Sequence, residues 1–314
     1  MKTFILPLIA LLTISTSAFA ETMAEAYQRN LQGMSRVNSD GPRGNPVCTE
    51  RYQALQRDGV LNIVWGLGYA DNSPGNYVFE LAYEALVTRT LLAPCTPGLN
   101  LCGFRRSPQD PNLYLKSTRN LSGSALQVEL KIVKGSLSVD NAFNTSDANR
   151  ARQQASCEAA RAEYARAIEN GAEVVLYSGH ARDGAGPDFC PPVRRADGHT
   201  NYTWYHQNKI GKWRMINAMQ TAAKAKKPNQ LVGLYACYTR RHFEKNIAAA
   251  LPRAGFIGTD VGPSLIEVYH YAFGTIDSLL AMRCQQGLRE SLDVISPHAV
   301  MVNVFDRGIV RATP

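Results

Sequence analysis

A histidine and a cysteine each follow a short apolar run, and together they are residue types that can break an amide bond. His180 comes directly after Tyr177-Ser178-Gly179, and Cys237 comes directly after Tyr235-Ala236. A cysteine thiolate attacks a carbonyl carbon, and an imidazole takes up the thiol proton and delivers it to the leaving amine. Two such side chains in one crevice would suit the hydrolysis of a peptide bond.

The runs before the two residues, 174–177 and 231–235, are too short for helices and predict buried parallel strands. Strands and helices alternate along most of the chain, which predicts an α/β fold with a mostly parallel sheet and helices on both faces. Functional residues of such sheets gather beyond the carboxyl ends of the strands, where His180 and Cys237 stand. The other predicted strands are 61–65, 126–133, 255–258 and 300–305, and the predicted helices are 77–92, 148–170, 210–227, 243–251 and 264–283.

A strand that enters Ser-Gly-His and a second that enters Ala-Cys, 57 positions later, resemble the caspase-like cysteine peptidases. This clan includes caspases, legumain, clostripain and gingipains, and the resemblance covers residues 60–285 in element order. It implies a three-layer sandwich in which Cys237 is the nucleophile and His180 is the general acid and base. It further implies an oxyanion hole made of the backbone N–H groups of Ala181 and Cys237. A peptide or protein is the implied substrate, and no cofactor or metal ion is implied.

Three further residues are weaker candidates for contacting a substrate. Arg182 and Asp188 lie in the Gly- and Pro-rich loop 181–192, whose charged side chains can line a pocket. The alternative for this loop is an ordered turn with Arg182 and Asp183 as a surface ion pair. Tyr235 stands two residues before the cysteine, where caspases have Gln and the Arg-cleaving branch has Asp.

Two other functions remain open. The first is a non-catalytic envelope protein that binds a peptide or a glycan in the crevice above the sheet. The second is a hydrolase of another fold that uses Ser178, although Ser178 lacks the Gly-x-Ser-x-Gly elbow. Labelling of Cys237 by a carbonyl-mimicking thiol reagent separates the cysteine peptidase from both.

The chain has seven cysteines, so in an oxidising compartment at most three pairs form and at least one thiol is left over. Cys95 and Cys102 flank the turn Thr96-Pro97-Gly98 and are predicted to pair. A nucleophile locked in a disulfide cannot attack a carbonyl, and we therefore predict that Cys237 is free.

The N-terminus predicts export. Lys2 precedes an apolar run over residues 4–14 and the small-residue site Ala18-Phe19-Ala20, as in a signal peptide over residues 1–20. We expect a leader helix and a loop over 21–59, one α/β domain over 60–314, and a periplasmic or secreted protein. No later stretch is apolar for the roughly 20 residues that span a membrane.

The formal net charge is +8, but the basic residues are scattered. The one tight run, Lys224, Lys226 and Lys227, predicts the solvated end of a helix rather than a nucleic-acid patch. We therefore expect no nucleic-acid partner, and the sequence leaves the oligomeric state open.

Overall fold

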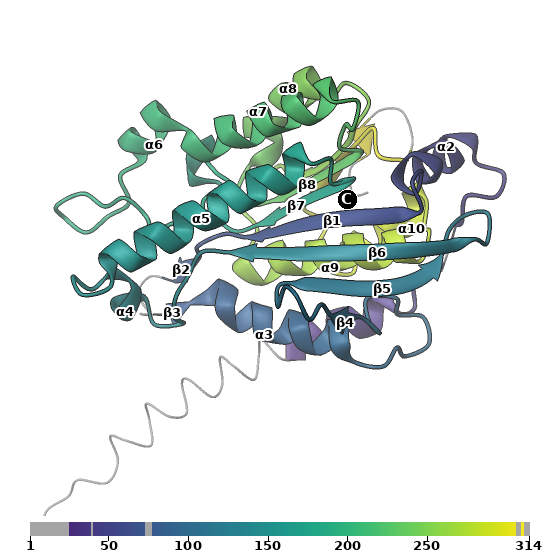
Figure 1. Cartoon of the computed structure of the whole chain (residues 1–314), viewed down its shortest axis with the longest axis horizontal. Coiled ribbons are helices and arrows are strands. Elements are labelled where there is room, and N and C mark those ends of the chain that lie inside the picture. Colours follow the sequence, from purple (N-terminus) through teal and green to yellow (C-terminus); the bar gives the residue numbers. More distant parts are fainter. Residues whose placement is uncertain (1–24, 39, 73–76, 306–308, 311–314) are drawn as a thin grey trace, which may run out of the picture.

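A computed structural model of the chain describes residues 25–38, 40–72, 77–305 and 309–310. The predicted signal peptide, residues 1–20, lies outside the described residues. In the described part of the chain, the main sheet has nine strands in the order β11-β10-β9-β8-β7-β1-β6-β5-β4 (Figure 1). The bounds of its strands are β1 Val60–Leu67, β4 Arg105–Arg106, β5 Leu113–Arg119, β6 Ala125–Lys134, β7 Val174–Ser178, β8 Leu231–Tyr235, β9 Gly255–Thr259, β10 Ala299–Val302 and β11 Ile309–Val310.

The five central strands, β9, β8, β7, β1 and β6, run parallel, and antiparallel strands extend the sheet on both sides. This arrangement confirms the predicted α/β fold class. A separate two-stranded ribbon, β2 Asp71–Asn72 and β3 Tyr77–Val78, lies beyond the end of β1.

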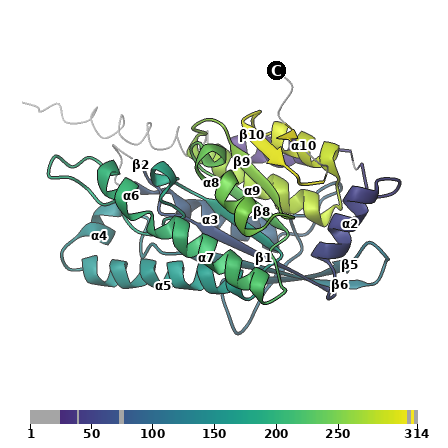
Figure 2. The ribbon, with the colours of Figure 1, turned by 90° about the horizontal axis from the view of Figure 1, so that it is seen from above.

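Helices cover both faces of the sheet and make a three-layer sandwich (Figures 1 and 2). One face packs against α3, α9 and α10, and the other face packs against α5, α7 and α8. The bounds of the helices are α2 Pro46–Leu55, α3 Phe79–Leu92, α4 Asn141–Thr145, α5 Arg150–Glu169, α6 Tyr202–Asn208, α7 Ile210–Lys224, α8 Thr239–Ala250, α9 Leu265–Leu280 and α10 Gln285–Asp293, and a single 3-10 turn, η1, covers Arg182–Gly184.

Burial on both faces explains why the central strands read as continuous apolar runs. In β7 the side chains of Val174 and Leu176 enter the core under α9, whereas those of Val175 and Tyr177 enter the core under α5 and α7. Every residue of β7 and of β8 is buried. Such strands have no polar face, so alternation is absent from their sequences.

The segment that we expected to precede the domain is packed into it. Residues 25–34 are helical, and the Asn30 amide nitrogen lies 2.6 Å from Nδ1 of His270 on α9. Helix α2 buries Tyr52 and Leu55 in the same core. A boundary at residue 60 therefore does not separate two bodies.

Residues 93–123 gave no strand signal in the sequence, yet they contain β4 and β5. Strand β5 pairs antiparallel with β6 over seven residues, from Leu113 opposite Lys131 to Arg119 opposite Ala125. Edge strands are half-exposed and therefore lack the apolar run that marks the central strands.

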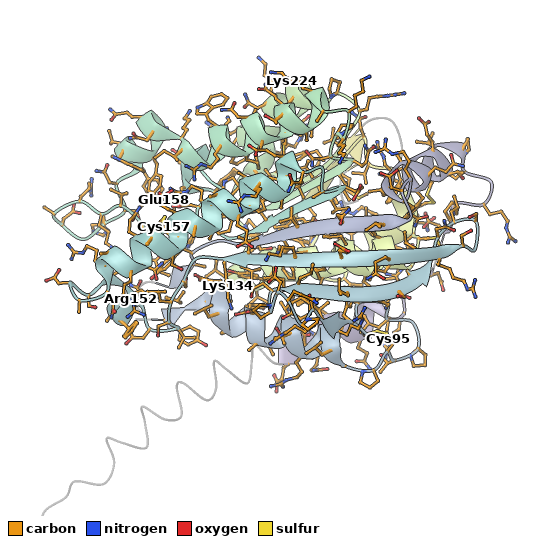
Figure 3. The ribbon with its side chains drawn as sticks, viewed as in Figure 1. Cys95, Lys134, Arg152, Cys157, Glu158 and Lys224 are labelled. Carbon is orange, nitrogen blue, oxygen red and sulfur yellow. A yellow bond between two sulfur atoms is a disulfide. The ribbon has the colours of Figure 1, made fainter. Side chains whose placement is uncertain are left out.

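All seven cysteines lie in the described part of the chain, and six of them form disulfides: Cys48–Cys284, Cys95–Cys102 and Cys157–Cys190. The predicted Cys95–Cys102 pair and the predicted free thiol of Cys237 are both confirmed. Cys95 and Cys157 lie in separate regions of the molecule (Figure 3). Three disulfides are typical of a protein that matures in an oxidising compartment.

Lys224 is the last residue of α7, and it is exposed together with Lys226 and Lys227. This run is therefore the solvated end of a helix, as predicted. Within the described residues, every helix is too short or too polar to cross a membrane.

Candidate functional site

His180 and Cys237 leave the sheet at the same edge from neighbouring strands. Strands β7 and β8 are in register, with Ser178 opposite Tyr235, and the Gly179 N–H donates to the Tyr235 carbonyl over 3.2 Å. His180 and Cys237 are each the second residue after this last pair. Neighbouring strands of a sheet lie about 4.8 Å apart, so the register brings the two residues out of the sheet at the same edge, from adjacent strands.

Glycine is required at the turn that carries His180. A Cβ on Gly179 would lie 2.8 Å from the Tyr177 hydroxyl and 3.0 Å from Cα of Gly68. Gly68 follows β1, and its N–H donates to the Ser178 carbonyl over 2.8 Å. The chain segments at the ends of β1 and β7 are therefore in backbone contact. This contact places the residues that follow β1 next to the turn that carries His180.

The environment of His180 keeps its imidazole neutral. Burial and the Arg182 guanidinium lower the pKa of His180 to about 4, against the opposing effect of the Asp71 and Asp188 carboxylates. The backbone of Asp71 also raises the pKa of His180, as the smallest of these influences. In a neutral imidazole one ring nitrogen carries a proton and the other can accept one.

Sequence reasoning missed Asp71 as part of this site. Its only signal is position, because it stands four residues after the end of β1, at the edge where β7 and β8 also end. A single aspartate after a strand has no pattern of its own, and only the turn after β1 decides which groups it faces.

Cys237 lies between the end of β8 and the start of α8. Helix α8 begins at Thr239, four residues before the predicted start. Tyr238 stands between Cys237 and this helix, and its backbone is left-handed, with φ 53°. The Tyr238 N–H donates to the Val261 carbonyl over 2.9 Å, which fixes this turn. The Cys237 side chain is half-buried, and a Cβ built on Gly262 would lie 3.5 Å from its Sγ.

Two influences oppose each other at the Cys237 thiol. Burial raises its pKa above the ordinary value, and its own backbone N–H acts in the other direction. Its place before the first turn of α8 also favours the thiolate, since helix N-termini attract negative charge. The net effect is a raised pKa for the Cys237 thiol, and the pKa of the His180 imidazole is lowered, so both shifts favour the neutral forms at neutral pH.

Ala181 and Cys237 are the two expected oxyanion donors, and Ala181 is buried whereas Cys237 is half-buried. Ala181 has φ −72° and ψ −18°, a conformation that needs no glycine. Its carbonyl accepts from the N–H groups of Gly184 and Gly186, over 2.9 and 3.0 Å. Among the described residues, the N–H groups of Ala181 and Cys237 donate to no other residue.

Arg182 does not form the surface ion pair with Asp183 that was the alternative for this loop, because Arg182 is buried and lies beside Asp71 and Asp188. Arg182 and Asp188 have only 5% and 4% of their surfaces exposed. The Asp188 carboxylate accepts from Arg161 over 2.9 Å and from the Tyr205 hydroxyl over 3.1 Å. Arg182 Nε lies 3.4 Å from the same carboxylate. We conclude that these two residues hold the loop after His180, and they have little surface with which to touch a substrate.

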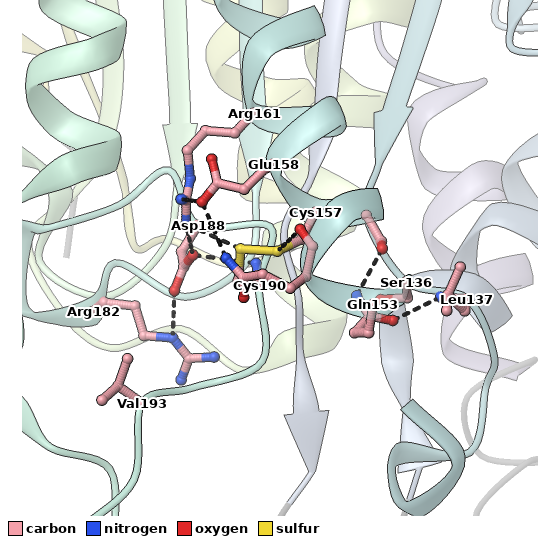
Figure 4. The surroundings of a disulfide bond; sticks show 12 residues. Ser136, Leu137, Gln153, Cys157, Glu158, Arg161, Arg182, Asp188, Cys190 and Val193 are labelled. Carbon is pink, nitrogen blue, oxygen red and sulfur yellow. Dashed lines mark hydrogen bonds and ion pairs between the residues drawn. A yellow bond between two sulfur atoms is a disulfide. The ribbon is translucent and has the colours of Figure 1, made fainter. Parts of the chain in front are cut away.

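A disulfide ties this buried network to α5. Cys157 on α5 is bonded to Cys190, two residues after Asp188, and Arg161 lies one turn further along the same helix (Figure 4). The Cys190 N–H donates to Asp188 over 3.2 Å. The disulfide, the Arg161 ion pair and the loop therefore form one connected support behind His180.

Tyr235 and Ser178 lie in the core under α9 and not in a crevice. Tyr235 is completely buried and its hydroxyl lies 2.6 Å from Oγ1 of Thr275. Ser178 is also completely buried; its hydroxyl donates to the Val268 carbonyl over 2.8 Å and accepts from Trp65 over 3.1 Å. The expectation that Tyr235 contacts a substrate is corrected, and Ser178 cannot serve as a nucleophile.

One other group of titratable side chains lies close by. The carboxylate of Asp183 lies beside the rings of His206 and His242, 3.5 Å from Nε2 of the second. No group of three His, Cys, Asp or Glu side chains in the described part of the chain is arranged to hold a metal ion.

Comparisons of the chain with models of protein families, with curated proteins and with solved structures found no match.

Proposed function

We propose that this protein is a periplasmic or secreted cysteine peptidase that uses Cys237 as nucleophile and His180 as general acid and base. The observation that supports the proposal is the register of β7 and β8, which sends the cysteine left out of the disulfides and a histidine with a lowered pKa out of adjacent strands at one edge of the sheet. The resemblance of the two strand-exit motifs to caspase-like peptidases supports the same assignment. The substrate is a peptide or a protein.

The two neutral groups fit a mechanism in which proton transfer accompanies attack. The free nitrogen of His180 takes the thiol proton as Sγ of Cys237 bonds to the scissile carbonyl carbon. The N–H groups of Ala181 and Cys237 stabilise the oxyanion, and His180 returns the proton to the amine as the C–N bond breaks. Water then attacks the thioester, again with His180 as base, which releases the acid and regenerates the thiol.

The first prediction tests this chemistry on the disulfide-bonded protein. Cys237→Ala should abolish cleavage of a peptide library read by mass spectrometry, because it removes the atom that bonds to carbon. His180→Ala should lower the rate by about 10²-fold or more, as expected for a missing acid and base. A peptide bearing a carbonyl-mimicking electrophile should label Cys237 in the wild type and not in Cys237→Ala.

His199→Ala is the matched control, since His199 is an exposed histidine further along the loop region after His180. It should cleave at the wild-type rate. Cleavage that survives in Cys237→Ala would show that the chemistry is wrongly assigned. If no substrate is cleaved and no electrophile labels the thiol, the alternative function, a non-catalytic binding protein, replaces the peptidase proposal.

A further inference from the structure

The two N–H groups proposed to bind the oxyanion each share a peptide group with the carbonyl of the residue before. The Ala181 N–H belongs to the peptide that carries the His180 carbonyl, and the Cys237 N–H belongs to the peptide that carries the Ala236 carbonyl. Both peptides are trans, so the carbonyl and the N–H point in opposite directions within one plane. A group that holds the carbonyl therefore also sets the direction of the N–H.

A buried tyrosine hydroxyl holds the first of these carbonyls. The Tyr177 hydroxyl, on β7, lies 3.1 Å from the His180 carbonyl and 3.1 Å from the Asp188 carbonyl, and it accepts the Asp188 N–H over 3.0 Å. The Asp188 carbonyl also accepts from the Tyr69 N–H over 3.0 Å. Among the described residues no other group donates to the His180 carbonyl, which makes it the acceptor that needs the single hydroxyl proton.

A buried threonine hydroxyl holds the second carbonyl. Thr259 is the last residue of β9, and its hydroxyl donates to the Ala236 carbonyl. The hydroxyl of Thr239 donates to the Leu234 carbonyl over 2.7 Å and accepts the Thr259 N–H over 2.9 Å. Because the Thr239 proton goes to Leu234, the Thr259 proton goes to Ala236.

We propose that Tyr177 and Thr259 are positioning residues for oxyanion binding: each hydroxyl holds the carbonyl of one peptide and thereby orients the N–H on its other side. The hydrogen bond at the carbonyl also polarises the peptide, so the N–H becomes a stronger donor, as in other chains of hydrogen bonds. The inference rests on the proposed function, because these N–H groups matter to a reaction only if an oxyanion forms. Neither hydroxyl is assigned a contact with the substrate.

Two substitutions remove the hydroxyls and keep the shapes of the side chains. Tyr177→Phe leaves the ring packed edge-on against Phe189, and Thr259→Val leaves a β-branched side chain on β9. Thr259→Ser keeps the hydroxyl and is the rescue variant. The matched control is Tyr164→Phe, since Tyr164 is a buried tyrosine on α5 whose hydroxyl donates over 3.1 Å to the Leu176 carbonyl, on a peptide that carries neither N–H.

The two peptides can each be observed by NMR without a substrate. Histidine labelled with ¹³C at its carbonyl, together with ¹⁵N-alanine, reports on two peptides of the chain, 180–181 and 298–299. The first is identified by its absence from His180→Gln, and the second is an internal reference. Alanine labelled with ¹³C at its carbonyl, together with ¹⁵N-cysteine, reports on the peptide 236–237 alone.

A carbonyl carbon and the amide nitrogen bonded to it become more shielded when the carbonyl loses a hydrogen bond. Tyr177→Phe should therefore move the 180–181 signal upfield, and Thr259→Val should move the 236–237 signal upfield. Tyr164→Phe and Thr259→Ser should leave both signals near their wild-type positions. Unchanged signals in both Tyr177→Phe and Thr259→Val would overturn the inference, because the hydroxyls would not hold these carbonyls.

A second arm separates oxyanion binding from the reactivity of the thiol. A peptide aldehyde reacts reversibly: Sγ of Cys237 bonds to the aldehyde carbon, the C=O π pair moves to the oxygen, and His180 takes the thiol proton. The resulting oxygen occupies the place of the oxyanion. Iodoacetamide alkylates the same sulfur by displacing iodide, and no oxyanion forms.

Tyr177→Phe and Thr259→Val should each weaken aldehyde binding and lower kcat by about 10-fold, a part of the roughly 10²-fold that loss of a whole oxyanion donor costs. KM and the rate of alkylation by iodoacetamide should change little. Thr259→Ser and Tyr164→Phe should behave as the wild type in each assay. A purely structural role would instead lower the alkylation rate together with aldehyde binding.

The outcomes distinguish this inference from the proposed function. If the wild type cleaves peptides and binds the aldehyde, and both hydroxyl variants do so equally well, the positioning role is wrong and the peptidase proposal stands. If the wild type neither cleaves peptides nor binds the aldehyde, the peptidase proposal fails and the positioning role fails with it. If one variant does not fold, the other tests the inference by itself, because the two hydroxyls hold separate peptides.

Discussion

The protonation states of His180 and Cys237 decide how the proposed dyad starts its reaction. An imidazole with its pKa lowered to about 4 does not hold a proton at neutral pH, so it cannot stabilise a resting thiolate. The thiol itself is half-buried, and burial raises its pKa. The charged ion pair of many cysteine peptidases is therefore not the resting state here.

The second prediction follows for the reactivity of Cys237 with a small alkylating reagent. The rate of alkylation by iodoacetamide should keep rising with pH above the ordinary thiol pKa of about 8.5, since only the thiolate reacts. The rate is measured by mass spectrometry of the Cys237 peptide across a pH series. A plateau reached below pH 7 would contradict the prediction, because it would mean that a thiolate already exists beside a protonated His180.

At the scale of elements, the site depends on supports that come from both faces of the sheet. Helix α5 holds the loop after His180 through Arg161 and the Cys157–Cys190 disulfide. Helix α3 holds the turn after β1 through Glu80. The strand register brings the two catalytic candidates to one edge, and these helices fix the loops that carry their partners.

The third prediction concerns the Cys157–Cys190 disulfide. The double change Cys157→Ser and Cys190→Ser should lower the free energy of unfolding by up to about 4 kcal/mol, the loop-entropy value for a sequence separation of 33 residues. It should also lower peptide cleavage, because the Asp188 loop loses its tie to α5. Denaturant unfolding and cleavage assays measure the two effects.

The matched control removes the Cys95–Cys102 disulfide, whose partners are 7 residues apart and belong to the loop after α3. The same entropy argument gives about 2 kcal/mol for it. Cleavage at temperatures where the variant stays folded should be unchanged. Equal losses of activity in both variants would mean that the Cys157–Cys190 disulfide has no particular link to the site.

At the scale of the whole molecule, a buried histidine links the N-terminal segment to the core. His270 on α9 is completely buried between Asn30 and Tyr83, with Nε2 3.1 Å from the Tyr83 hydroxyl. Burial lowers its pKa to about 4. The folded state therefore holds this ring neutral, while the unfolded chain protonates it near pH 6.5.

The fourth prediction is the pH dependence that results. Between pH 6.5 and pH 4 the unfolded state binds more protons at His270, so stability falls as pH falls through this window. A shift of this size corresponds to about 3 kcal/mol. The effect of Glu80 on stability has the opposite dependence on pH. Its pKa is raised to about 7 in the folded state, so the stability that it contributes is lost as pH rises from 4.5 to 7.

The contribution of His270 is isolated by comparing the wild type with His270→Gln at each pH. Glutamine can hydrogen-bond to Asn30 or Tyr83 but does not titrate in this range. Urea unfolding should show a shallower decline of stability between pH 6.5 and pH 4 in the variant. Parallel curves for the two proteins would contradict the assignment.

The sequence alone determined the central architecture and the two candidate residues. The strands that precede His180 and Cys237 are buried on both faces, so their apolar runs stand out from the helices around them. The parity of the cysteines required a leftover thiol, and the short spacing of Cys95 and Cys102 indicated their disulfide. These signals depend on residues close together in the sequence or on a residue count, so a single sequence is enough to reveal them.

Only the tertiary structure decided what surrounds the dyad. Arg182 and Asp188 were candidates for lining a substrate pocket, but Arg161 on α5 pairs with Asp188 inside the protein. Tyr235 was a candidate for contacting a substrate from its place two residues before Cys237, yet α9 covers it. The contacts of Asp71 and Glu80 with their partners depend on how β1, α3 and β7 meet, and a buried carboxylate has no pattern that sequence spacing can reveal.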